Sequence, residues 1–164
     1  DRQQLIKKCE IIPIEFVVRN IASGSICSRL GIKDGLQLKK PLLEYYLKED
    51  SLDDPIVSRD HLELFGWATK KEIEKIDKMS LKINQYLTSH FKKKGIILVD
   101  FKIEFGRLSS DKRKIILADE ISPDSCRLWD SKSKTKLDKD VFRKGIGNLI
   151  DAYEEVASRL GIVH

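Results

Sequence analysis

The sequence predicts an α+β fold, in which helices pack on an antiparallel sheet, and three observations lead to this fold class. Residues 99–105 alternate between apolar and charged side chains, which is typical of a strand with two different faces. Residues 69–94 place apolar side chains at intervals of three and four, which is typical of an amphipathic helix. A polar loop, residues 107–114, precedes a second strand-like segment, residues 115–121, and this order predicts a hairpin. At 164 residues, the chain is long enough for one domain with a sizeable core.

The N-terminal third of the chain predicts a strand, a short helix and a second strand. Residues 11–18 (IIPIEFVV) are strand-like, and Pro13 favours a position at the edge or the start of a sheet. A short helix is expected next, with Ser25 as its N-cap and Gly31 as its C-terminal glycine. The segment PLLEYYLKED, residues 41–50, is again strand-like, and the following SLDDP predicts a turn.

After the middle of the chain we expect one long helix, the hairpin and a broken C-terminal helix. The sequence TKKE at residues 69–72 is a capping box, and the helix is expected to end before Gly95. Its apolar face consists of Ile73, Ile76, Met79, Ile83, Leu87 and Phe91. Residues 138–160 also have helical periodicity, which Gly145 and Gly147 are expected to divide into two pieces.

Composition and charge exclude several classes of protein. The chain is 41% hydrophobic and 35% charged, which is typical of a globular protein, and no apolar run approaches the roughly 18 residues of a membrane span. Its three cysteines form no CxxC pair, which favours a reducing cytoplasm over a disulfide framework or a thiolate zinc site. The three histidines lack HxxxH spacing, so any metal is expected to be held by oxygen. The net charge of +5 is spread along the chain, so neither nucleic acid nor a membrane is an expected partner.

The alternating strand of the hairpin has two interpretations. Its apolar side chains are expected to face the core: Val99, Phe101, Ile103 and Phe105. Its charged side chains, Asp100, Lys102 and Glu104, form the other face, which is either a solvated outer surface or a functional surface. The neighbouring strand carries Asp119 and Glu120, one of which would share the face of Glu104. Two carboxylates on adjacent strands suit Mg²⁺, which accepts one or two protein carboxylates and completes its shell with phosphate and water oxygens.

Two further segments predict anion binding. In RNIASGS, residues 19–25, small residues let a ligand approach the backbone, a helix begins, and Arg19 can grip an anion with two parallel bonds. The alternative is an ordinary strand-to-helix turn with a solvated arginine. The segment SPDSCRLWD adds a second arginine, Arg127, next to Trp129, and its alternative is a helix or turn anchored by the tryptophan.

Read in order, six segments resemble the signature segments of one enzyme family. They are KKCEIIPIEFVVRNIASGS, RLGIKDG, DDPIV, GIILVDFKIEFG, LADEISPDSCRLWD and LDKDVFR, and the family is phosphoribosylaminoimidazole-succinocarboxamide synthase, or SAICAR synthetase. The resemblance runs from about residue 7 to the C-terminus and implies the larger lobe of a two-lobed fold. It implies that residues 1–14 are the hinge and the end of an N-terminal ATP-binding lobe absent from this chain, which opens at Asp1 without Met, and that residues 15–164 are the substrate- and metal-binding lobe. The chain departs from the family at Lys40 and in its longer, more basic loop 107–114.

The resemblance implies an ATP-dependent ligase of de novo purine biosynthesis. It would join carboxyaminoimidazole ribonucleotide to L-aspartate through an acyl phosphate, giving SAICAR, ADP and phosphate, with ATP and Mg²⁺ as cofactors. The cysteine usage already favours the cytoplasm, and a homodimer is one assembly that the sequence leaves open. Two alternatives remain open: a small-molecule phosphotransferase with similar lobes, which would need no aspartate pocket, and a basic module that binds nucleic acid or an acidic partner.

The resemblance also implies a role for particular residues. Substrate binding, chiefly at the ribonucleotide phosphate, falls to Arg19, Ser25 and Arg127, with Asp54 as a weaker assignment. Catalysis next to the reacting groups falls to Asp100 and Lys102, and a lysine between two acids keeps its charge. Metal binding falls to Glu104 and Asp119. The hinge would contact the adenine through the main chain of Glu10, Ile11 and Ile12.

Overall fold

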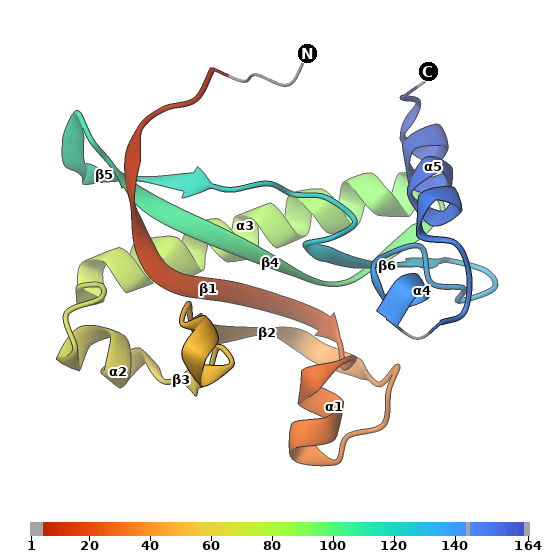
Figure 1. The fold of residues 1–164 in the computed structure, drawn as a ribbon, viewed down its shortest axis with the longest axis horizontal. Coiled ribbons are helices and arrows are strands. Elements are labelled where there is room, and N and C mark those ends of the chain that lie inside the picture. The colour runs from red at the N-terminus through yellow and green to blue at the C-terminus, as the bar shows by residue number, and fades with distance from the viewer. Residues whose placement is uncertain (1–4, 144, 163–164) are drawn as a thin grey trace.

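In a computed structural model, which describes residues 5–143 and 145–162, the chain forms a six-stranded antiparallel sheet (Figure 1). The order of the main path is β3-β2-β1-β4-β5, and β6 pairs with β4 beside β5. The strands are β1 (Cys9–Ile21), β2 (Gln37–Leu47), β3 (Ile56–Val57), β4 (Ile96–Leu108), β5 (Asp111–Ala118) and β6 (Cys126–Asp130). The helices are α1 (Ser25–Leu30), the 3-10 helix η1 (Asp50–Leu52), α2 (Arg59–Leu64), α3 (Lys70–Lys93), α4 (Asp140–Arg143) and α5 (Leu149–Leu160). The predicted α+β class is confirmed.

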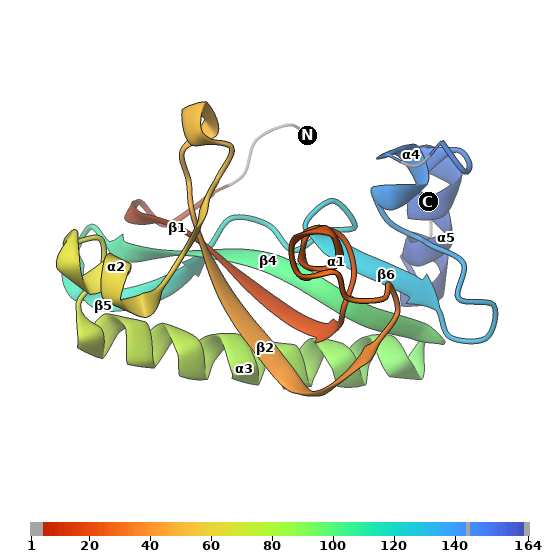
Figure 2. The same ribbon diagram turned by 90° about the horizontal axis from the view of Figure 1, so that it is seen from below.

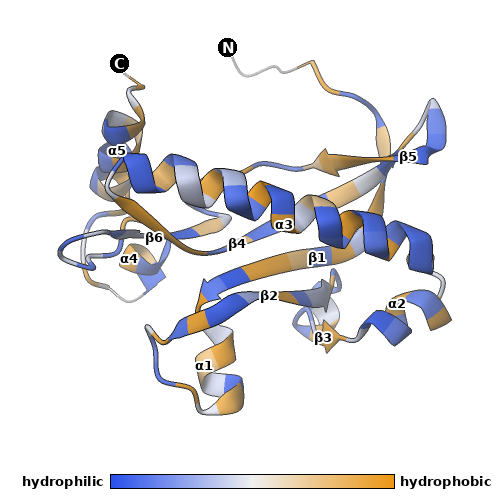
Figure 3. Cartoon of the chain, turned by 180° about the vertical axis from the view of Figure 1, so that it is seen from behind, coloured by the Kyte–Doolittle hydropathy of each residue, from blue (hydrophilic) through white to orange (hydrophobic). Residues whose placement is uncertain are grey.

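Helix α3 covers one face of the sheet, and the loop between β2 and β3 and helix α4 lie on the opposite side (Figure 2). Both bonds of the predicted capping box are present at its start: the Thr69 side chain accepts from the Glu72 N–H, and the Glu72 carboxylate accepts from the Thr69 N–H. Apolar and polar residues alternate along the helix (Figure 3). Its predicted apolar face packs on the core, where Ile73, Ile76, Leu87 and Phe91 are buried.

The two faces of the sheet differ in chemistry because side chains alternate along each strand. In β1 the core face consists of Ile12, Ile14, Phe16 and Val18, and in β4 it includes Phe101, Ile103 and Phe105. Val99 is buried as predicted, but on the opposite face of the sheet. The pairing of β4 with β6 shifts between Leu98 and Asp100, so Val99 faces the other way and packs in a small second cluster with Ile21 and Trp129.

Pro13 was predicted to lie in an edge strand or at the start of a sheet. It does not lie in an edge strand, because β1 lies between β2 and β4. Proline is tolerated in this central strand because the pairing with β4 shifts between Ile11 and Glu15, so no regular ladder bond is required there. The boundary expected after residue 14 falls inside β1, and Ile12 and Ile14 belong to the same core as the rest of the sheet.

Three further expectations are corrected. The N-cap of α1 is Gly24, not Ser25, which is the first residue of the helix and makes no capping bond. Strand β5 begins at Asp111 and ends at Ala118, so the loop is shorter than predicted and Asp119 and Glu120 follow the strand. Strands β3 and β6 and helix α2 were not predicted. The break in the C-terminal helix is confirmed, since α4 and α5 are separate and Gly145 has a φ of 61°.

No helix within the described residues has the length and apolar character needed to cross a membrane.

Candidate functional site

Charged and polar side chains from four strands meet on the face of the sheet opposite α3. They are Glu44 and Tyr46 from β2, Glu15 and Arg19 from β1, Asp100, Lys102 and Glu104 from β4, and Arg127 from β6. The interpretation of this face as a solvated outer surface is wrong, because Asp100 is only 3% exposed and Glu104 only 4%. Buried charges persist in proteins when they are paired or held for function, so this face is the candidate site.

A cavity of about 150 Å³ lies in this face and gathers five of the residues predicted from the sequence: Arg19, Ser25, Asp100, Lys102 and Arg127. The same cavity is lined by Glu15, Tyr46 and Lys139, which the sequence reasoning missed. The signal for Lys139 was present in LDKDVFR, one of the segments used for the resemblance, but no residue of that segment was assigned a role.

Arg19 is buried at the centre of a hydrogen-bond network. Its Nε donates to Glu44 (2.6 Å), and its Nη1 donates to Asp100 (2.7 Å) and to the carbonyl of Ser23 (3.2 Å). Its Nη2 donates to Ser25 Oγ (3.1 Å) and to the Tyr46 hydroxyl (3.2 Å). All five N–H groups of the guanidinium therefore have partners within the protein. Gripping a phosphate with two parallel bonds would require Arg19 to give up two of these contacts.

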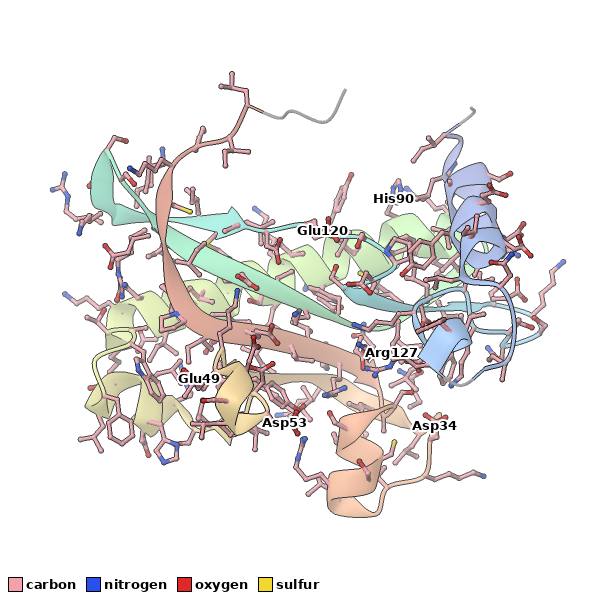
Figure 4. The ribbon with its side chains drawn as sticks, in the orientation of Figure 1. Asp34, Glu49, Asp53, His90, Glu120 and Arg127 are labelled. Atoms are coloured by element: carbon pink, nitrogen blue, oxygen red, sulfur yellow. The ribbon has the colours of Figure 1, made fainter. Side chains whose placement is uncertain are left out.

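Arg127 is oriented differently and has donors to offer. Its Nε donates to Asp140 (3.2 Å), and its Nη1 donates to both oxygens of Asp100 (3.0 and 3.2 Å). Nη2 has no hydrogen-bond partner among the described residues and lies over Gly24, where an added Cβ would come within 2.3 Å of it. Arg127 lies beside α4 (Figure 4), so β6 and α4 together hold this guanidinium over the turn that begins α1.

The cations around the cavity affect one another. Burial lowers the pKa of Lys139, and the positive charges of Arg143, Arg127 and Lys102 lower it further. Burial also opposes the charge of Lys102, but the hydrogen bond to Glu15 and the attraction of Glu15, Glu104 and Asp119 raise its pKa above the usual value. A bound anion would relieve the repulsion at Lys139, so this part of the cavity is suited to a phosphate or a carboxylate.

Four alternating charges lie at the β5 side of the cavity. Glu15 and Glu104 are register partners in β1 and β4. Lys102 contacts Glu15 (2.5 Å), and Lys48, which follows β2, contacts both oxygens of Glu104 (2.8 Å each). Glu104 therefore already binds a cation through both carboxylate oxygens. Carboxylate oxygens are also the ligands that a divalent metal ion such as Mg²⁺ takes from a protein.

The predicted metal ligand Asp119 lies just after β5 with a φ of 59°, and its charge acts on Lys102 as that of Glu104 does. Within residues 5–143 and 145–162, no group of three or more acidic, histidine or cysteine side chains is gathered around one point. One or two carboxylates are enough for Mg²⁺ that shares its shell with a nucleotide, so these residues fit that ion.

A second cavity, of about 630 Å³, lies between the N-terminal segment and β5 and is lined by Ile11 and Asp119 among others. Of the other expected hinge residues, Ile12 is buried in the core, and Glu10 pairs with Lys112 (2.8 Å) away from the cavity. Asp54 lies in the loop after η1, where its carboxylate accepts from the N–H of Glu49 (2.9 Å). The structure thus brings Ile11 and Asp119 together in one cavity. Asp54, in contrast, makes a hydrogen bond within its own loop.

Comparison with known proteins identifies relatives along the whole chain. A family model described as SAICAR synthetase matches residues 1–160. A phosphoribosylaminoimidazole-succinocarboxamide synthase from Pelagibacter ubique (strain HTCC1062) is 61% identical over 164 residues, which are 99% of this chain and 63% of that protein. The chain thus spans less than two thirds of the length of this relative.

Solved structures agree with this result. The phosphoribosylaminoimidazole-succinocarboxamide synthase from Ehrlichia chaffeensis superposes with a TM-score of 0.95 at 51% identity, over 98% of this chain and 68% of that one. A SAICAR synthetase solved in complex with ADP gives a TM-score of 0.89 at 48% identity, over 93% of this chain and 64% of that one. The matching family model and these relatives place the chain in the SAICAR synthetase family.

Proposed function

We propose that this chain is the substrate- and metal-binding part of an ATP-dependent ligase that joins carboxyaminoimidazole ribonucleotide to L-aspartate. The single observation that carries the proposal is the cavity in which Arg127, Lys102 and Lys139 meet above a buried carboxylate, Asp100. Both reactants are anionic, so a site for them needs cations held in fixed positions. Family membership supports the same reaction, because the relatives are named as synthetases of SAICAR, the product of this reaction.

In this proposal each side of the cavity has its own task. The free edge of Arg127 and the hydroxyl of Ser25 bind the ribonucleotide phosphate, and Lys139 adds charge there. Arg19 keeps Ser25 and Asp100 in position through its own bonds. Lys102, held by Glu15, presents a fixed cation to the substrate carboxylate, where negative charge changes as an acyl phosphate forms and aspartate attacks it.

The nucleotide belongs at the second cavity, beside Ile11 and Asp119. A SAICAR synthetase of 48% identity was solved with ADP, which supports this assignment of a nucleotide to the fold. Mg²⁺ would be held by Glu104 and Asp119, and when bound it would offset charge on the nucleotide phosphates. We also propose the cytoplasm as the location, which the cysteine usage favours, and a homodimer as the assembly.

The test is the dependence of ADP formation on L-aspartate. Because the chain is shorter than its relatives, the assay uses a chimeric protein. In this chimera the chain replaces the matching residues of the Pelagibacter ubique protein, to which it is 61% identical. With Mg-ATP and carboxyaminoimidazole ribonucleotide, we expect ADP and the succinocarboxamide to form together, and only when aspartate is present. ADP formed at the same rate without aspartate, together with a phosphorylated ribonucleotide that accumulates, would favour a phosphotransferase instead.

A further inference from the structure

Lys48 occupies a position that the proposed function assigns to a metal ion. It follows the last residue of β2, and its backbone N–H donates to the carbonyl of Pro13 (3.0 Å) in β1. From there the side chain reaches across β1 to β4, where its ammonium contacts both carboxylate oxygens of Glu104 at 2.8 Å. The two partners differ in burial, since the side chain of Lys48 is 40% exposed and that of Glu104 is 6% exposed.

The neighbouring pair explains why a cation is needed at this point. Glu15 and Glu104 are directly opposite each other in the β1–β4 ladder, and two like charges in such a position repel each other. Lys102 offsets the charge of Glu15 (2.5 Å), and Lys48 offsets the charge of Glu104. A buried carboxylate without a counterion is strongly unfavourable. A cation on the oxygens of Glu104 is therefore favourable whether or not a metal ion is bound.

We propose that the Lys48 ammonium stands in for the divalent cation on Glu104 and leaves when the cation binds. The inference rests on the metal role of Glu104 in the proposed function. One pair of oxygens cannot hold an ammonium and a metal ion at the same time, so the two cations compete.

Lys48 is the lysine suited to leave. Its side chain is 40% exposed, and the loop that follows it carries four acidic residues that can attract the ammonium once it leaves: Glu49, Asp50, Asp53 and Asp54. Figure 4 places Glu49 and Asp53 on this loop, in front of the sheet face that carries the site. Lys102 has its own carboxylate, Glu15, and stays in place.

The test measures metal affinity directly, with Mn²⁺ as the probe and electron paramagnetic resonance of the unbound ion as the readout. In Lys48→Met the competitor is gone, so we expect Mn²⁺ to bind roughly twofold to fivefold more tightly than to the unchanged chain, the range expected for a partly exposed ion pair. Glu104→Gln alone should weaken Mn²⁺ binding, and adding Glu104→Gln to Lys48→Met should abolish the gain. Lys112→Met, which removes the same charge from a pair with Glu10 outside the site, is the matched control and should leave Mn²⁺ affinity unchanged.

Thermal unfolding supplies a second readout. Without metal, Lys48→Met leaves Glu104 without its counterion, so its Tm should fall, and Mn²⁺ should raise that Tm by more than it raises the Tm of the unchanged chain. Equal Mn²⁺ affinity in the unchanged chain and in Lys48→Met would overturn the exchange while leaving the metal role of Glu104 intact. Mn²⁺ binding that Glu104→Gln does not weaken in any background would overturn both the exchange and the metal assignment of the proposed function.

Discussion

Gly24 shows how one residue without a side chain allows the site to form. Its φ of 66° and ψ of −135° lie in a region that L side chains rarely adopt, and the guanidinium of Arg127 lies directly over its Cα. The closeness of this contact explains why Arg127 can point its Nη2 edge toward the turn before α1. In the sequence, the glycine of RNIASGS predicted a close approach of a ligand to the backbone, whereas in the structure the approaching group is an arginine of the protein itself.

Gly24→Ala is therefore expected to displace Arg127 and to weaken binding of the ribonucleotide more than tenfold. The added Cβ would lie 2.3 Å from Nη2, so the guanidinium has to move. Gly31→Ala is the control, because Gly31 also has a positive φ (65°) but open space around it. Calorimetric titration with the ribonucleotide should give unchanged affinity for Gly31→Ala, although both variants lose some stability from backbone strain. Equal ribonucleotide affinities for Gly24→Ala and Gly31→Ala would show that Arg127 does not bind the phosphate.

The two arginines of the site should respond differently to replacement by lysine. Arg127→Lys keeps the charge but loses the free Nη2 edge, so ribonucleotide affinity should fall about tenfold to hundredfold, the value of one charge-assisted hydrogen bond. Arg19→Lys removes several of five internal bonds, so it should chiefly lower the free energy of unfolding, by about 2 to 4 kcal/mol. Urea unfolding and calorimetry on both variants measure the two effects. A stable Arg19→Lys variant that binds the ribonucleotide weakly would instead support the prediction from the sequence that Arg19 binds the phosphate with two parallel bonds.

At the scale of elements, the sequence is informative where one period dominates. Helix α3 was predictable because its apolar residues recur at helical spacing between a capping box and Gly95. Strand β6 was missed because both of its faces carry apolar residues. Trp129 on its second face is buried in a small separate cluster, so the segment CRLWD lacks the alternation of apolar and polar residues that predicts a strand. Helix α2 has a single buried residue, Leu62, and so lacks a periodic pattern.

The site could be predicted in part for the same kind of reason. Asp100, Lys102 and Glu104 share a face by parity within one strand, so the sequence placed them together. Glu15, Tyr46 and Lys48 join them only through the register of β1 with β2 and β4, which depends on tertiary packing and on the irregularity around Pro13. Asp119 lies beyond the end of β5, where parity no longer applies.

The capping box of α3 also joins the helix to the sheet, and this gives a prediction at the scale of the element. Glu72, which closes the box, accepts from Arg107 of β4 (2.7 Å). Thr69→Ala removes the side chain that accepts from the Glu72 N–H, so the free energy of unfolding should fall by about 1 kcal/mol. Ser89→Ala removes a hydroxyl from an exposed position of the same helix and should cost nothing measurable. Urea unfolding of both variants tests this, and equal stabilities would show that packing alone fixes the start of α3.

For the molecule as a whole, the sheet divides two tasks between its faces. One face buries apolar side chains against α3 and supplies most of the core. The other carries a chain of alternating charges that links β2 to α4: Glu44, Arg19, Asp100, Arg127 and Asp140. Each charge in this chain is offset by the next, so elements distant in sequence are fixed relative to one another where the proposed substrate binds. Such a face stabilises the fold less than apolar packing would, and its retention is consistent with a binding role.

The pH dependence of stability should reflect this use of buried charge, and Asp138 is the group that shows it best. Burial raises its pKa from 3.8 to about 6, against the opposing hydrogen bonds from the N–H groups of Asp140 and Leu128. The folded chain therefore holds this proton more tightly than the unfolded chain. Its contribution to the free energy of unfolding is fully present below about pH 4 and is lost as the pH rises through 6, a fall of roughly 2 to 3 kcal/mol.

Glu72 has the opposite sign and provides the comparison within the same molecule. The hydrogen bond from Arg107 lowers its pKa to about 2, so its contribution is present above pH 4.5 and is lost as the pH falls through 2. Asp138→Asn cannot ionise, so the variant should lose the fall between pH 4 and pH 6 while keeping the loss at lower pH. Urea unfolding of the unchanged chain and of Asp138→Asn at a series of pH values from about 2 to 8 measures both limbs. If the two curves stay parallel between pH 4 and pH 6, then Asp138 is ionised in the folded chain throughout that range, and its buried charge is stabilised by its two N–H donors rather than by a proton.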